Sequence, residues 1–110
     1  MLKSEEIPFQ LIAKAGDARS YAYEALEVAK SGKFDEAFEI LDKCETLLNE
    51  AHKVQFEIIC QESTGGCDVT LSFLMVHAQD HLMTAILAAE LIKEQIETRK
   101  YFTEKIENLK

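Results

Sequence analysis

The sequence has few of the residues that interrupt helices. Its 110 residues include only four glycines and one proline, and 47% of them are hydrophobic. A chain rich in Ala, Leu, Glu and Lys with so few turn-formers favours a small number of long helices. The length is that of one domain, residues 1–110. A domain of this size can bury a hydrophobic core without added stabilisation from disulfides or metals.

Basic residues are also scarce. Twelve Lys and Arg face twenty Asp and Glu, so the formal net charge is −8. Nucleic acids and anionic membrane surfaces are bound through basic patches, and the excess of acid argues against both as partners. A basic partner protein is more plausible.

Long apolar runs and paired cysteines are missing as well. No run approaches the ~20 residues that span a bilayer, and the start, MLKSEEIPFQ, is too polar for a signal peptide. Cys44, Cys60 and Cys67 are an odd number without paired spacing, which favours reduced thiols. We expect Cys44 and Cys60 to pack within a helix and Cys67 to lie in a loop. These features predict a cytoplasmic protein without membrane insertion.

Two breaks divide the chain. The first is at Gly32, which can take the left-handed conformation that ends a helix, and the second is the small, polar stretch 63–68. Asp68 is a suitable N-cap for the segment that follows. Short connections between long helices make antiparallel neighbours. The prediction is an all-α, up-down-up three-helix bundle with helices at roughly 5–31, 34–62 and 69–108.

The third segment is apolar on two sides. At about 100° per residue, one stripe is suited to close the core, and it comprises Leu71, Leu74, Ala78, Leu82, Ala85, Ala89, Ile92 and Ile96. A second stripe comprises Phe73, Thr84, Leu87, Ala88 and Leu91, includes His77 and Asp80, and borders His81. Only a narrow arc is charged or polar, with Gln79, Glu90, Lys93, Glu94 and Glu97. Since a three-helix monomer covers one stripe well, we expect self-association through the second.

Asp80 is the unusual member of the second stripe. A buried carboxylate must be protonated, paired or metal-bound, and no Lys or Arg lies within a turn of it. In a symmetric oligomer its copies would face one another, and a hard cation such as Mg²⁺ would relieve their repulsion. The alternative is an Asp at the solvent-facing edge of the stripe.

His77 and His81 are four residues apart and share a helix face. The zinc helix motif has Glu directly after its first His and a third ligand downstream. Here Ala78 follows His77, and no His or Cys follows His81, which argues against zinc. By spacing alone, a structural role for such histidines is commoner than catalysis. His52 is isolated and is interpreted as structural.

The stretch Val76-His-Ala-Gln-Asp-His-Leu-Met-Thr-Ala85 closely resembles the signature of the lactose/cellobiose family of enzyme IIA components. These proteins belong to the bacterial phosphoenolpyruvate-dependent sugar phosphotransferase system, and the N,N'-diacetylchitobiose type is included. The resemblance covers most of the chain in order. It extends to Ala15-Gly-Asp-Ala-Arg-Ser20, Gly32-Lys-Phe-Asp-Glu-Ala37 and Ala51-His-Lys-Val-Gln55.

The resemblance implies a homotrimer of three-helix protomers. It implies that His77 accepts a phosphoryl group from the histidine-containing phosphocarrier protein and passes it to a cysteine of enzyme IIB during sugar uptake. Asp80 would bind one Mg²⁺ per trimer together with its symmetry mates, and His81 and Gln79 would line the phosphoryl pocket. Family members often carry Lys or Arg where this chain reads Leu87-Ala-Ala-Glu90, a departure that bears on partner docking and on the sugar.

A second hypothesis of another class stays open at this stage. The chain could be a non-enzymatic helical scaffold whose two-faced third segment pairs with a partner helix. In that case His77 and Asp80 would hold the interface and carry no phosphate.

Overall fold

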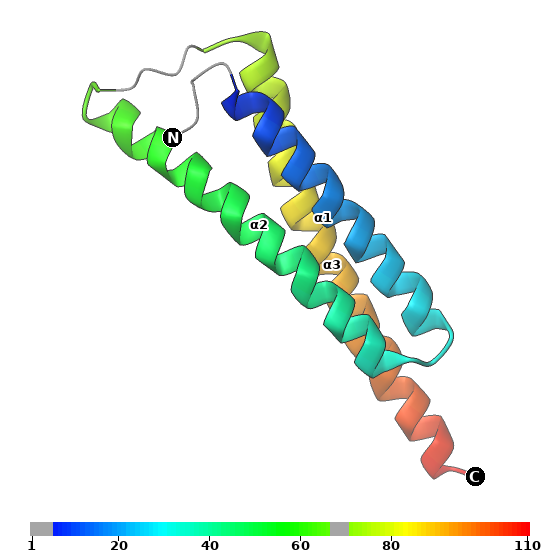
Figure 1. Ribbon diagram of the computed structural model, residues 1–110. Helices are drawn as coiled ribbons and strands as arrows, with labels where there is room; N and C mark the ends of the chain where they lie inside the picture. Colours follow the sequence, from blue (N-terminus) through cyan, green and yellow to red (C-terminus); the bar gives the residue numbers. More distant parts are fainter. Residues whose placement is uncertain (1–5, 67–70) are drawn as a thin grey trace.

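Three helices form an elongated bundle in the computed structural model, which describes residues 6–66 and 71–110. The helices are α1 (Ile7–Lys30), α2 (Phe34–Ser63) and α3 (Phe73–Asn108), and they run up, down and up along a body of 63 × 22 × 21 Å (Figure 1). No strand occurs in the two described ranges. The all-α, up-down-up prediction is confirmed.

The helix ends follow local chemistry. Gly32 has φ +82°, so it provides the left-handed turn after α1. Ser72 caps α3, because its side chain accepts a hydrogen bond from the backbone N–H of Met75 at 3.0 Å. The predicted cap, Asp68, lies outside the described residues. The third helix therefore begins at Phe73, four residues later than the sequence pattern suggested.

Helix α1 lies against both other helices and does so through small side chains. Its buried face carries five alanines, which let the backbones of neighbouring helices approach closely: Ala15, Ala18, Ala22, Ala25 and Ala29. Helix α3 meets this face with Ala78, Leu82, Ala85, Ala89, Ile92 and Ile96, all buried. Most of the first predicted stripe is thus the core. Leu71 and Leu74 are the exceptions: Leu71 precedes the helix and is 84% exposed, and Leu74, in the first turn, is only half-buried.

Helix α2 diverges from the other two toward its C-terminal end (Figure 1). Cys44, in its first half, is buried as predicted, whereas Cys60, near its end, is exposed. The expectation that Cys60 packs inside was wrong because the diverging end has no helix on that side; Phe56 and Ile59 are exposed there too. Cys67 lies outside the described residues.

None of the helices in the described part of the chain combines the length and the apolar character that crossing a membrane requires.

The buried thiol of Cys44 makes stability depend on alkaline pH. Burial, with the adjacent Glu45 carboxylate, raises the pKa of Cys44 from 9.0 to about 11. The unfolded thiol ionises first, so unfolding releases a proton in this window and the stability falls as the pH rises from about 9 to 11. The loss reaches about 2–3 kcal/mol. We expect urea unfolding of wild type and Cys44→Ala to show a free-energy difference that shrinks across this window. If the difference in unfolding free energy between the two proteins did not change with pH, the raised pKa of Cys44 would be contradicted.

Candidate functional site

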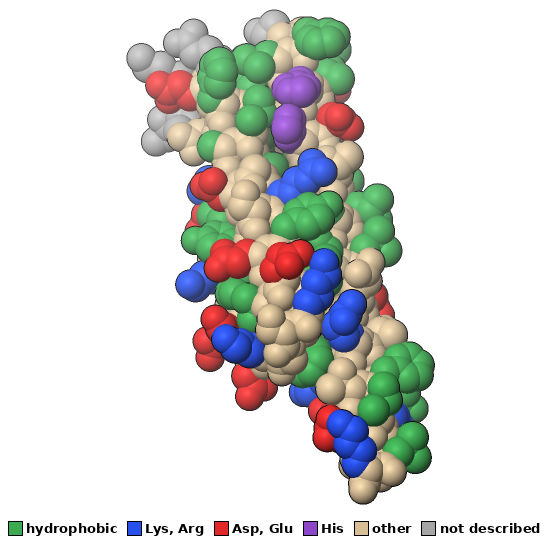
Figure 2. Space-filling model, turned by 90° about the vertical axis from the view of Figure 1, so that its right-hand side faces the viewer, with side chains coloured by type: hydrophobic (Ala, Val, Ile, Leu, Met, Phe, Trp, Pro, Cys, Tyr) green, Lys and Arg blue, Asp and Glu red, His purple; other side chains and the backbone are tan. Residues whose placement is uncertain are grey.

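His77 and His81 form a contacting pair near one end of the bundle, where Figure 2 shows two histidine side chains next to each other on the surface. Their Nε2 atoms are 3.1 Å apart, the ring centroids are 4.5 Å apart, and the rings are nearly perpendicular at 86°. This contact requires one Nε2 to carry a hydrogen and the other to accept it. His77 is exposed and His81 is half-buried. His77 is therefore the ring that a second molecule can reach, and His81 supports it.

The start of α3 gives the pair its electrostatic setting. Because the helix begins at Phe73, His77 lies in its second turn, close to the positive end of the helix dipole. The sequence has no Lys or Arg between Lys53 and Lys93. The stretch that carries the pair therefore brings no basic side chain of its own to His77.

Gln79 departs from its predicted position. The sequence placed it on the charged arc, but it is half-buried and its Oε1 accepts a hydrogen bond of 2.6 Å from Nε2 of Gln55 on α2. Gln55 is the one buried polar side chain of the described residues, and its Oε1 lies 3.2 Å from Nδ1 of His52. Sequence reasoning missed Gln55, because a pair of amides on two helices leaves no spacing signal in either helix.

Asp80 lies on the second stripe as predicted, with its side chain exposed in the single chain. Around it Phe73, Leu87 and Leu91 are 89%, 55% and 56% exposed, so the stripe is uncovered. Among the described residues Asp80 forms no salt bridge, and no group of three or more possible metal ligands occurs. Carboxylate oxygen suits a hard cation, and within the described residues one chain supplies a single such group here.

The second stripe continues onto α1. A shallow cavity of about 310 Å³ lies between the two helices, lined by Tyr23, Leu26, Thr84, Leu87, Ala88, Leu91, Ile92 and Gln95. Tyr23 is 48% exposed. The uncovered face therefore consists of a ridge on α3 and a hollow beside it. The hollow could accept the corresponding ridge of another copy.

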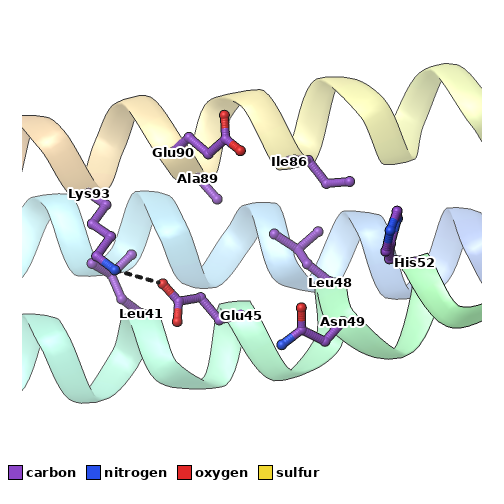
Figure 3. A pocket seen from close by; sticks show the side chains of 9 residues that line it. All are labelled: Leu41, Glu45, Leu48, Asn49, His52, Ile86, Ala89, Glu90 and Lys93. Carbon is purple, nitrogen blue, oxygen red and sulfur yellow. Dashed lines mark hydrogen bonds and ion pairs between the residues drawn. The ribbon is translucent and has the colours of Figure 1, made fainter.

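Another cavity, of about 470 Å³, separates α2 from α3 (Figure 3). Leu48 and Ile86 point toward each other across it, and Lys93 closes one end with an ion pair to Glu45, Nζ to Oε1 3.4 Å. Its lining includes His52 but neither the histidine pair nor Asp80. This cavity is separate from the candidate site.

Comparison with known proteins gives one consistent result. Residues 6–100 match the family described as "PTS system, Lactose/Cellobiose specific IIA subunit". The lactose-specific EIIA component of Staphylococcus epidermidis is 42% identical over 92 residues, covering 84% of this chain and 88% of that protein. The cellobiose-specific enzyme IIA of Bacillus anthracis, a crystal structure, superposes with a TM-score of 0.86 at 48% identity, covering 96% and 95% of the two chains. The Escherichia coli IIA(chitobiose), solved in complex with HPr, gives a TM-score of 0.79 at 43% identity, covering 94% and 99%.

Proposed function

Because the chain belongs to the lactose/cellobiose-specific IIA family of the phosphotransferase system, we propose that it relays a phosphoryl group through His77. The donor is the histidine-containing phosphocarrier protein and the acceptor is a cysteine of enzyme IIB, during uptake of a lactose- or cellobiose-type sugar. The observation that carries this assignment is the exposed ring of His77 held against His81 at 3.1 Å in the second turn of α3.

The transfer breaks a P–N bond in the donor and forms a P–N bond at His77. The attacking nitrogen must carry no hydrogen, because its lone pair makes the new bond. In one of the two arrangements that the contact allows, His81 Nε2–H faces the bare Nε2 of His77. The contact has to open for transfer, because the Nε2 lone pair that accepts this hydrogen bond is the one that attacks phosphorus, and the freed His81 N–H can then donate to a phosphoryl oxygen. His81 thus positions the acceptor before transfer and holds the product after it.

The charge of the phosphoryl group needs stabilisation that this chain supplies only in part. A phosphoryl group brings nearly two negative charges at neutral pH to a chain of net charge −8. The N-terminus of α3 contributes little, because the effect of the helix dipole falls off within the first turn and His77 lies in the second. Phosphoryl transfer depends mainly on positioning and charge stabilisation, so basic groups of the partner complete the site. The relative solved with HPr supports this carrier protein as the partner.

The proposed working form is a homotrimer in which the second stripe of α3 faces the threefold axis. Burial of the exposed Phe73, Leu87 and Leu91 supports association, and the hollow beside α1 accepts side chains of the next copy. In this arrangement the three Asp80 carboxylates converge, and one Mg²⁺ would offset two of their three negative charges and keep several of its waters. The cation has a structural role and takes no part in the transfer.

The scaffold hypothesis differs from the relay in one measurable property. Wild-type protein incubated with phosphoenolpyruvate, enzyme I and the carrier protein should acquire a phosphate that is labile in acid and stable in base, as expected for a phosphohistidine. Intact-mass spectrometry before and after brief acid treatment measures it. A related IIA protein serves as the positive control. If that control is labelled and this protein is not, the result would support the scaffold hypothesis.

A further inference from the structure

Arg19 is an exposed basic residue near the middle of α1. It forms no salt bridge within the described residues, and its guanidinium lies over the half-exposed ring of Tyr23, with Cζ 5.9 Å from the ring centroid. The preceding basic residue of α1, Lys14, is instead held by Glu50 on α2, Nζ to Oε2 2.8 Å. A cation–π contact at an exposed site is weak, so an anion nearby can draw the guanidinium away from Tyr23.

The face of α1 that carries Arg19 adjoins the row of α3 that carries both histidines. Tyr23 of α1 and Thr84 of α3 line the same cavity of about 310 Å³. Arg19 precedes Tyr23 by four residues and is about 40° from it around the helix. On α3, His77, His81 and Thr84 lie within about 60° of one another. Arg19 and the histidine pair are therefore on the facing flanks of two neighbouring helices.

Arg19 is also close to the level of the pair along the bundle. Helices α1 and α3 run in the same direction (Figure 1), so one turn back along α1 from Tyr23 corresponds to one turn back along α3 from Thr84. The first step reaches Arg19 and the second reaches His81. Because the Cα–Cβ bond in a helix tilts toward the N-terminus, the Arg19 side chain can extend toward His77 without movement of either helix. Figure 2 shows a basic side chain below the two histidines on the same face.

The proposed phosphoryl group gives this arginine a ligand. The group brings nearly two negative charges to α3, and the sequence has no Lys or Arg between Lys53 and Lys93. Basic groups of the carrier protein leave with it after the transfer, so the charge then has to be stabilised by this chain or by water. A guanidinium suits the task, because its planar fork can donate two parallel hydrogen bonds to phosphoryl oxygens.

We propose that Arg19 binds the phosphoryl group of His77 after the transfer: its guanidinium leaves the Tyr23 ring and donates hydrogen bonds to the phosphoryl oxygens. The proposal rests on the relay of the proposed function and adds to His81 a second phosphoryl ligand, from another helix. Arg19 then has two positions, on Tyr23 in the unmodified protein and on the phosphoryl group in the modified one. It stabilises the phosphorylated protein between the departure of the carrier and the arrival of the acceptor.

The equilibrium of the transfer tests this role. Purified phosphorylated protein is mixed with unmodified carrier protein, without phosphoenolpyruvate or enzyme I, and the phosphorylated fraction of each is measured by intact-mass spectrometry. Arg19→Gln should shift the equilibrium toward the phosphorylated carrier by about fivefold or more, because a charge-assisted hydrogen bond to the product is lost. Lys14→Gln, the matched control, removes one positive charge from the same helix and should shift the equilibrium less than twofold.

Phosphorus NMR of the phosphorylated protein without any partner gives a second readout. A guanidinium beside the phosphoryl group favours its dianion, so the phosphoryl pKa should be lower in wild type and in Lys14→Gln than in Arg19→Gln. Arg19→Lys keeps the charge but not the fork. This variant should therefore keep a low phosphoryl pKa and show an intermediate equilibrium.

Equal equilibria and equal phosphoryl pKa values in wild type and Arg19→Gln would overturn binding by Arg19 and leave the relay through His77 standing. A changed rate of transfer with an unchanged equilibrium would also overturn it, since that result is expected of a residue that only docks the carrier. Wild-type protein that never acquires the label would overturn the relay and the role of Arg19 together.

Discussion

Replacement of His77 by alanine should abolish phosphoryl acceptance completely. His77 is the exposed member of the pair, and no other described side chain places an exposed imidazole nitrogen against a second ring. The measurement is phosphate incorporation from phosphoenolpyruvate through enzyme I and the carrier protein. His52→Ala is the matched control, since His52 lies on α2 and contacts Gln55, and it should label at the wild-type rate.

The variant His81→Ala tests whether His77 can accept the phosphoryl group without the hydrogen bond from His81. The label should still appear on His77, but the rate should fall by about tenfold to a hundredfold, because a hydrogen bond to a charged group contributes about 1.5–3 kcal/mol. His81→Gln keeps an N–H donor and should recover part of the loss. Full labelling of His77→Ala, or a label located on His81 in the wild type, would contradict the assignment.

Replacement of Asp80 by leucine should remove the effect of Mg²⁺ on the trimer and leave the trimer intact. In the proposed trimer, three converging carboxylates would repel one another unless a cation lay between them. A bound ion at a hundred times its dissociation constant stabilises the folded form by about 2.7 kcal/mol, so chelation should lower the melting temperature. Leucine extends the apolar stripe of Leu87 and Leu91 and needs no cation.

The measurement is thermal unfolding with EDTA and with Mg²⁺, alongside light scattering. Asp80→Asn is the control of matched size: it removes the charge, should lose Mg²⁺ dependence, and should gain less stability in EDTA than leucine does. Wild-type protein indifferent to Mg²⁺, or unchanged Mg²⁺ affinity in Asp80→Leu, would contradict the shared site.

Much of the architecture followed from patterns within single helices. Four glycines and one proline left room for few breaks, and Gly32 ended α1 as its position suggested. The two stripes of α3 were also visible, because the direction of a side chain around its own axis depends only on its position in the helix. One stripe is the core and the other is uncovered, and self-association remains a prediction for the uncovered one.

The role of the histidines was less accessible from spacing. Two histidines four residues apart indicate a shared face and nothing about which ring is exposed. The resemblance around residues 76–85 supplied the role of His77, and that role stays a prediction. The structure added that His77 is the outer ring and His81 the half-buried one, so a second molecule can reach His77 more readily.

The sequence by itself determined the number of helices and the face of the third helix that carries His77 and Asp80. Only the tertiary structure decided the start of α3 at Phe73, the contact between Gln55 and Gln79, and the exposure of Cys60. The physical reason is that periodicity reports a direction about one axis. Contacts between helices depend on how far apart two axes lie and how they diverge, and α2 diverges from the other two toward its C-terminal end.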